Sequence, residues 1–110
     1  MPLRYDVTVT AATVSAALPM NLWGGAPFNV SLLLLNTSTG NSSTVQHTMH
    51  NPFATDFATG AVWVAHATMA SVTSTAGVDG NYAFPVSAIR LNVGTFGSGS
   101  VRLIVTQQGV

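Results

Sequence analysis

Alternation of apolar and polar residues is the clearest pattern along this chain. Residues 3–10 place leucine, tyrosine and two valines at odd positions, and arginine, aspartate and two threonines at even positions. This period of two predicts a β-strand with one face toward a core. Similar alternation predicts strands in residues 28–35, 44–49, 89–93 and 101–106. In residues 28–35 the second face changes from polar to apolar, which predicts a strand whose end is covered on both sides.

Polar and glycine-rich segments separate the predicted strands. Residues 36–43 contain only Asn, Thr, Ser and Gly, and they predict a turn that joins the flanking strands into a hairpin. Residues 94–99 hold three glycines and predict a second hairpin from the last two strands. Asp79 and Gly80 predict the centre of a turn over residues 74–81.

The remaining segments are less regular. Residues 16–27, with two prolines and two glycines, and residues 53–60 are predicted loops. Residues 61–72 are predicted as a strand because valine and threonine recur there, although the alanines would tolerate a helix. Pro85 places residues 82–86 at the edge of a sheet or leading into it.

Together these patterns predict an all-β protein. About six to eight strands joined by turns are typical of an antiparallel β-sandwich or a jelly-roll-like barrel. The length fits a single domain over residues 1–110 that has its own core. No run approaches the roughly 20 apolar residues of a membrane-spanning helix, and the start of the chain lacks the apolar stretch of a signal peptide.

Charged residues are scarce. The 110 residues include three Asp and three Arg, with no Lys or Glu, and the formal net charge is zero. Soluble domains usually carry about 25 % charged residues, and a net charge helps to keep them dispersed. The composition therefore predicts a homo-oligomer or a subunit whose surface other proteins cover. Three scattered Arg do not form the basic surface that nucleic acid requires, and we expect direct contact with neither nucleic acid nor a membrane.

Three histidines are the main candidates for metal binding or catalysis. His47 and His50 would share a face of a helix, but on the predicted strand their spacing points them to opposite faces. His66 would join them only through tertiary folding, and Cys and Glu are absent as further ligands. The three Asp form no spaced pair, and no Gly-x-Ser-x-Gly elbow is present. We therefore expect no metal, no cofactor and no catalytic residue.

Several large apolar residues fall in predicted loops rather than in strands. Such side chains either fold back over the open ends of a sandwich or anchor a partner, and Trp is favoured at interface centres. We predict these loop residues as the partner-binding set: Met20, Leu22, Trp23, Phe53 and Phe57.

The chain also resembles a group of viral proteins. It is rich in Thr, Ser, Ala, Val and Gly, and its last two predicted strands read AIRLNV at 88–93 and, after the turn, GSVRLIV at 99–105. In this it is similar to the small all-β virion proteins of tailed bacteriophages, above all capsid cement or decoration proteins. The resemblance implies a non-enzymatic protein, made in the host cytoplasm, that binds the major capsid protein or other virion proteins and stabilises the capsid surface. The scarcity of charge departs from that group, whose exposed members often carry more.

Two alternatives stay open at this point. One is a tail or fibre component, or a receptor-binding module for a glycan, for which Trp23 and Trp63 beside Asn21 are the candidate platform. The other is a small metal-binding protein or enzyme that uses His47, His50 and His66. Under the favoured hypothesis, apolar loops and strand edges make the contacts, so assembly should depend only weakly on salt.

Overall fold

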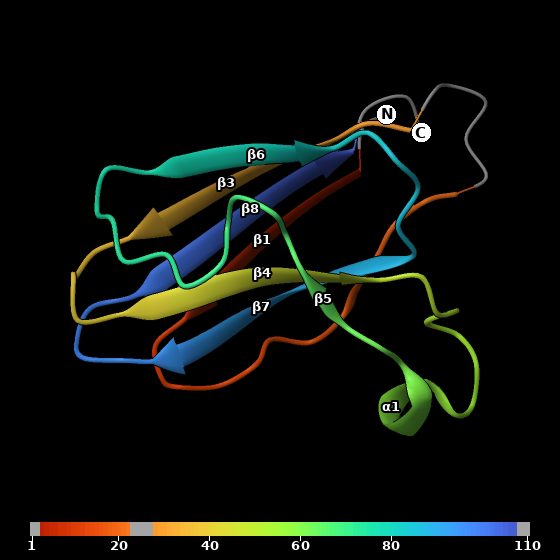
Figure 1. The fold of residues 1–110 in the computed structure, drawn as a ribbon, viewed down its shortest axis with the longest axis horizontal. Coiled ribbons are helices and arrows are strands. Elements are labelled where there is room, and N and C mark those ends of the chain that lie inside the picture. Colours follow the sequence, from red (N-terminus) through yellow and green to blue (C-terminus); the bar gives the residue numbers. More distant parts are fainter. Residues whose placement is uncertain (1–2, 23–27, 108–110) are drawn as a thin grey trace.

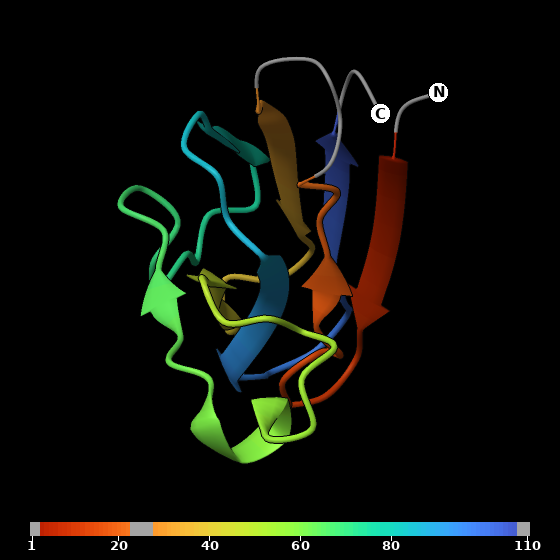
Figure 2. The same ribbon diagram turned by 90° about the vertical axis from the view of Figure 1, so that its right-hand side faces the viewer.

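Eight strands form two antiparallel four-stranded sheets that pack face to face (Figures 1 and 2). The computed structural model describes residues 3–22 and 28–107. The first sheet has the order β1 (Leu3–Val9), β8 (Val101–Gln107), β3 (Val30–Asn36) and β6 (Val78–Tyr82). The second has the order β2 (Leu18–Pro19), β7 (Ala88–Thr95), β4 (Ser42–Thr48) and β5 (Val64–Ala65). One short helix, α1 (Phe57–Gly60), lies outside the sheets.

The predicted antiparallel β-sandwich is confirmed. Alternate residues of the strands point inward, as the period of two requires. On the central strands β3 and β8 these inward residues are almost wholly inaccessible to solvent: Val30, Leu32, Leu34, Val101, Leu103 and Val105. In the part of the chain that the structure describes, no helix is long and apolar enough to cross a membrane.

Both predicted hairpins are wrong. β3 pairs with β8 and β6, whereas β4 pairs with β7 and β5, so the turn between β3 and β4 passes from one sheet to the other. The turn between β7 and β8 does the same, because β8 pairs with β1 and β3. The physical reason is that strands in facing sheets point their apolar residues into the same core. Their alternation therefore looks the same as that of two strands hydrogen-bonded in one sheet.

The strand predicted over residues 61–72 is also mostly wrong, because only β5 forms there. Val64, on this two-residue strand, is 52 % exposed, so a longer strand here would bury little of its apolar surface. The chain then turns at His66, whose Nδ1 accepts the Thr68 N–H at 3.1 Å. Met69 enters the core directly afterwards. The turn at His66 thus interrupts the regular ladder that the alternation predicted, although Met69 and Val72 still form backbone hydrogen bonds with β4.

β6 corrects a third prediction. Asp79 and Gly80 lie inside this strand, and the turn before it contains Gly77 with a φ of 78°. A Cβ on Gly80 would lie 2.9 Å from the Met69 sulfur and 3.2 Å from His66 Cε1. Close packing across the strand explains this glycine better than turn geometry does. β6 is an edge strand and ends at Tyr82, so the segment with Pro85 leads away from a sheet edge.

One face of β3 is more open than predicted. Ser31 and Leu33 on its outer face are exposed, and Leu33 retains 37 % of its accessible surface. Only Leu35 is half-buried. The apolar run of this strand therefore does not indicate cover on both sides, because the described residues form no third sheet on the outer face of the first one.

The end of the sandwich at which β3 and β7 finish is closed by polar groups. Asn41, wholly buried, donates from Nδ2 to the Ser98 carbonyl at 2.8 Å and to Asn36 Oδ1 at 3.1 Å. Its Oδ1 accepts the N–H groups of Gly97 at 2.7 Å and of Ser98 at 3.3 Å. Asn36 Nδ2 reaches the Thr73 carbonyl at 3.3 Å. Two amide side chains thus connect three loops, and we call this region the polar end.

Candidate functional site

Exposed apolar side chains gather at the opposite end of the sandwich. Strand direction places them there: the segments that follow β4 and β2 and those that precede β5 and β7 all meet at this end. Among the described residues, eight large hydrophobic side chains are exposed, and all but Val14 and Leu33 belong to these segments or, in the case of Val64, to β5 itself. We define the apolar end by the other six: Leu22, Met49, Phe53, Val62, Val64 and Phe84.

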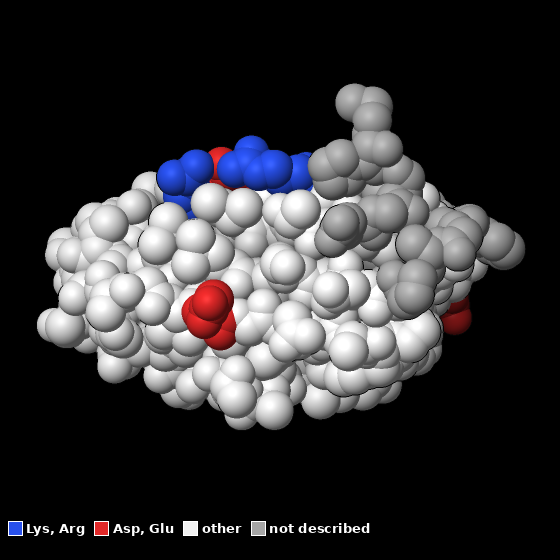
Figure 3. All heavy atoms as spheres, turned by 90° about the horizontal axis from the view of Figure 1, so that it is seen from above, with Lys and Arg blue, Asp and Glu red and all other residues white. Residues whose placement is uncertain are grey.

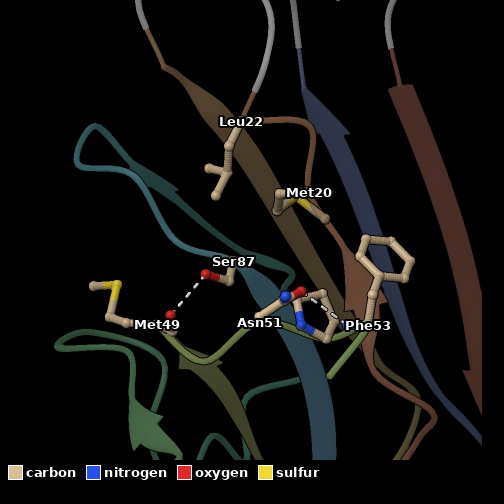
Figure 4. Close-up of a pocket in the computed structure, with 7 residues that line it drawn as sticks. Met20, Leu22, Met49, Asn51, Phe53 and Ser87 are labelled. Carbon is tan, nitrogen blue, oxygen red and sulfur yellow. Dashed lines mark hydrogen bonds between the residues drawn. The ribbon is translucent and has the colours of Figure 1, made fainter. Parts of the chain in front are cut away.

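A hollow of about 300 Å³ opens at the apolar end (Figure 4). Leu22 and Met20 line it from the segment after β2, and Met49 and Phe53 from the segment after β4. Met20 is 7 % exposed at its base, whereas Phe53 is 80 % exposed. Asn51, Pro52 and Ser87 complete the lining. No charged side chain lines this hollow among the residues described, so its chemistry suits an apolar group.

Backbone hydrogen bonds hold the segments around the hollow together. The Ser87 N–H donates to the Thr48 carbonyl at 2.8 Å, and the Met20 N–H donates to the Ser87 carbonyl at 2.9 Å. The Ser87 hydroxyl donates to the Met49 carbonyl at 2.9 Å. Asn51 Oδ1 accepts the Phe53 N–H at 3.0 Å in a local turn. These contacts fix the path of the backbone that carries Phe53 outward.

The structure brings together three of the five predicted partner-binding residues. Met20, Leu22 and Phe53 line the same hollow, although Met20 folds back into the core while the other two stay exposed. Phe57 lies on α1 and contacts Trp63 edge to face, with ring centroids 5.9 Å apart. Trp23 lies outside the described residues. Sequence reasoning missed Met49 and Ser87, because a methionine at a strand end and a lone serine carry no local signal.

The glycan platform proposed around Trp63 is not assembled among the described residues. The Arg90 guanidinium lies 4.2 Å from the centre of the Trp63 ring, in cation–π geometry. Asn21 instead pairs through its backbone with Gln107 at the end of β8. Trp63 and Asn21 therefore belong to different clusters.

Two of the three histidines lie together, and the third lies apart. His47 is buried and its Nδ1 lies 2.8 Å from the Tyr82 hydroxyl, while His66 Nε2 lies 2.9 Å from the Asn81 carbonyl. Both imidazoles contact the Tyr82 ring edge to face, each with a centroid distance of 4.8 Å. His50 follows β4 and is exposed. The described residues contain no group of three His, Cys, Asp or Glu side chains able to hold a metal.

Burial controls the protonation of this aromatic cluster. Burial lowers the pKa of His47, and the neighbouring His66 lowers it further. Burial raises the pKa of Tyr82, so its hydroxyl keeps its proton and donates to the neutral His47 Nδ1. His66 accepts the Thr68 N–H at Nδ1, so its proton is on Nε2 and points at the Asn81 carbonyl. The surroundings of His47 therefore favour its neutral form.

Acid should destabilise the fold through His47. Its pKa is lowered in the folded state, so the unfolded chain binds the extra proton first, and stability falls as the pH drops below the ordinary histidine pKa of about 6.5. We expect His47→Gln to reduce the slope of unfolding free energy between about pH 6.5 and 5, measured by urea denaturation. His50→Gln, the same substitution at an exposed position, is the matched control. An unchanged slope in His47→Gln would refute this assignment.

The largest group of charged side chains lies on β1 and β8 and does not line the hollow. Arg102 binds Asp6 through Nε to Oδ1 at 2.8 Å, and Arg4 lies 3.9 Å from the same carboxylate. This contact lowers the pKa of Asp6. In Figure 3 the blue atoms gather at one margin together with a few red ones, whereas other red atoms lie in the middle of the view and at its right-hand edge, and most of the surface in view is uncharged. Asp56 and Asp79 lie on other segments, so the three carboxylates do not converge on a catalytic pair.

Comparison with known proteins adds no relative. No protein-family model matches the chain, and no curated protein shows significant similarity to it.

Proposed function

We propose that this protein is a non-enzymatic structural subunit that binds and stabilises a larger protein shell through its apolar end. The observation that carries this proposal is a hollow with no charged lining among the described residues, which three of the six exposed side chains of the apolar end line: Leu22, Met49 and Phe53. Cores of protein interfaces are depleted in charge and enriched in aromatic residues and Met, and aromatic anchors in pockets carry much of the binding energy. Phe53 and Phe84 supply the anchors, and the hollow beside Phe53 can receive an apolar side chain of the partner.

The charge distribution supports the same proposal. Arg4, Asp6 and Arg102 satisfy one another on the first sheet, and the whole chain has no net charge. Electrostatic steering toward a charged partner is therefore weak, and burial of apolar area supplies the affinity. This fits a permanent contact within an assembly.

A virion shell is the partner that we propose. This part rests on the resemblance in composition to capsid cement proteins and on the sandwich fold. The major capsid protein or another virion protein would supply the apolar group that fills the hollow. Density-gradient sedimentation of material from the source of the protein tests this directly. The protein should travel with large particles in many copies and remain bound in molar salt. Recovery as a free species of low mass, or release by salt, would contradict the proposal.

Substitutions at the apolar end should weaken this attachment. We expect Leu22→Ser and Phe53→Ser each to lower retention on the particle about tenfold, because each removes an exposed apolar contact without touching the core. Leu33→Ser is the matched control, since Leu33 is similarly exposed but lies on the outer face of β3. Equal loss in all three variants, or in none, would show that the apolar end is not the docking surface.

A further inference from the structure

We propose that two copies of this protein pair through β1 to form a two-fold dimer with a continuous eight-stranded sheet. This goes beyond the proposed function, because it concerns another surface and a second copy of the chain as the partner. β1 is the outer strand of the first sheet and lies at one margin of the molecule (Figure 2). Within the described residues the backbone of its seven residues pairs only with β8, so the N–H and C=O groups of alternate residues on its outer side are free to accept another strand.

The other sheet edges are shorter or obstructed. On β6, His66 Nε2 donates to the Asn81 carbonyl at 2.9 Å. β2 has two residues, and the Pro19 carbonyl already accepts the Tyr5 hydroxyl at 2.7 Å. A proline also lacks the N–H that a further strand would need. β5 has two residues as well. β1 is therefore the edge best able to accept another strand.

The charges on β1 are complementary to those of a second β1. Opposed residues in an antiparallel pair share a face, so a two-fold axis at Tyr5 places Arg4 opposite Asp6 of the partner, and Asp6 opposite its Arg4. An axis at Arg4 or at Asp6 would instead oppose like charges. Charges of one sign on an edge strand would repel a second copy of the strand. On β1, one arginine and one aspartate flank Tyr5, so the register with its axis at Tyr5 pairs opposite charges.

The inner face of β1 supports the same register. Leu3, Tyr5 and Val7 point toward the core but are only half-buried, unlike the inward residues of β3 and β8. With the axis at Tyr5, Leu3 faces Val7 of the partner and the two Tyr5 side chains meet. The dimer would thus extend the core of each sandwich across the edge, and backbone hydrogen bonds would add affinity.

A charge swap tests the register. We expect the wild type to form a dimer at low ionic strength in sedimentation equilibrium. Arg4→Asp and Asp6→Arg should each weaken self-association about tenfold, because each opposes like charges twice. An equimolar mixture of the two variants should form a heterodimer of near wild-type affinity, since every pair across the axis is then opposite in sign. Arg90→Asp, the same substitution on the other sheet, should leave the dimer unchanged.

Hydrogen exchange tests the edge even if Asp6→Arg, which loses its bond to Arg102, folds poorly. Amides of β1 should become more protected as the wild-type concentration rises, while those of β6 should not. Phe53→Ser should dimerise like the wild type, so failure of the apolar-end proposal would not affect this result. A wild type that stays monomeric at millimolar concentration would overturn the inference, and so would a mixture that associates no better than its components.

Discussion

Replacing Asn41 by alanine is expected to lower the free energy of unfolding by about 2 to 3 kcal/mol. The side chain is wholly buried and is the centre of the polar end, where it bonds Asn36, Gly97 and Ser98. Alanine would leave the Asn36 oxygen without one of its donors and would leave the Gly97 N–H without its acceptor. Urea denaturation monitored by tyrosine and tryptophan fluorescence would measure the loss.

Two further variants separate hydrogen bonding from packing at this site. Asn41→Asp keeps the volume but loses both donors, so it should be at least as destabilising as Asn41→Ala. Asn29, which is exposed, provides the control, and Asn29→Ala should change stability by less than about 0.5 kcal/mol. Full stability in Asn41→Asp would show that the amide donors contribute nothing and that the polar end is held by other contacts.

The second large effect is expected at Gly99, where alanine should cost about 2 kcal/mol or more. Gly99 has a φ of 72°, a region that side chains with a Cβ rarely adopt. The added methyl carbon would also overlap Thr37 Oγ1, so the threonine would have to move. Thr37 Oγ1 accepts the Ser100 N–H at 2.8 Å, and this contact between the two turns would break.

Gly94 is the matched control for this substitution. It lies near the end of β7, and a Cβ there would meet no atom within 4 Å. Since alanine in a strand loses less conformational entropy than glycine, Gly94→Ala should leave stability unchanged or raise it by about 0.5 kcal/mol. Thermal unfolding of Gly99→Ala and Gly94→Ala under the same conditions would measure the difference in stability. Equal melting temperatures would mean that the turn at Gly99 relaxes without cost.

Alternation along the chain was sufficient to predict the fold class. The period of two survives in β1, β3 and β8 because each strand packs one face on a single core. What alternation does not contain is the identity of the neighbouring strand. β7 and β8 each carry a clear pattern, yet they lie in different sheets, and only long-range pairing decides this. Turn composition did not help, because a glycine-rich turn serves a crossing between sheets as well as a hairpin.

The candidate site was predicted in part for a related reason. Leu22 and Phe53 were found because large apolar residues in loops are unusual. Ser87 and Met49 lie beside them only because β7 pairs with β4, a contact across 38 positions of the chain. Gly80 shows the same limit, since the need for glycine comes from Met69 and His66 packing against the strand. Tertiary contacts of this kind leave no mark in a local pattern.

The pairing of β1 with β8 has a consequence for how the protein is made. β8 lies between β1 and β3 in the first sheet, and Leu3 lies opposite Gln107. The four-stranded sheet therefore cannot be completed until β8 has left the ribosome. Nearly every loop to be closed is long, which makes folding slow. During that delay the unpaired apolar strands are exposed to other nascent chains. The yield of folded protein should therefore depend on the rate of synthesis and on temperature more than on the stability of the finished sandwich.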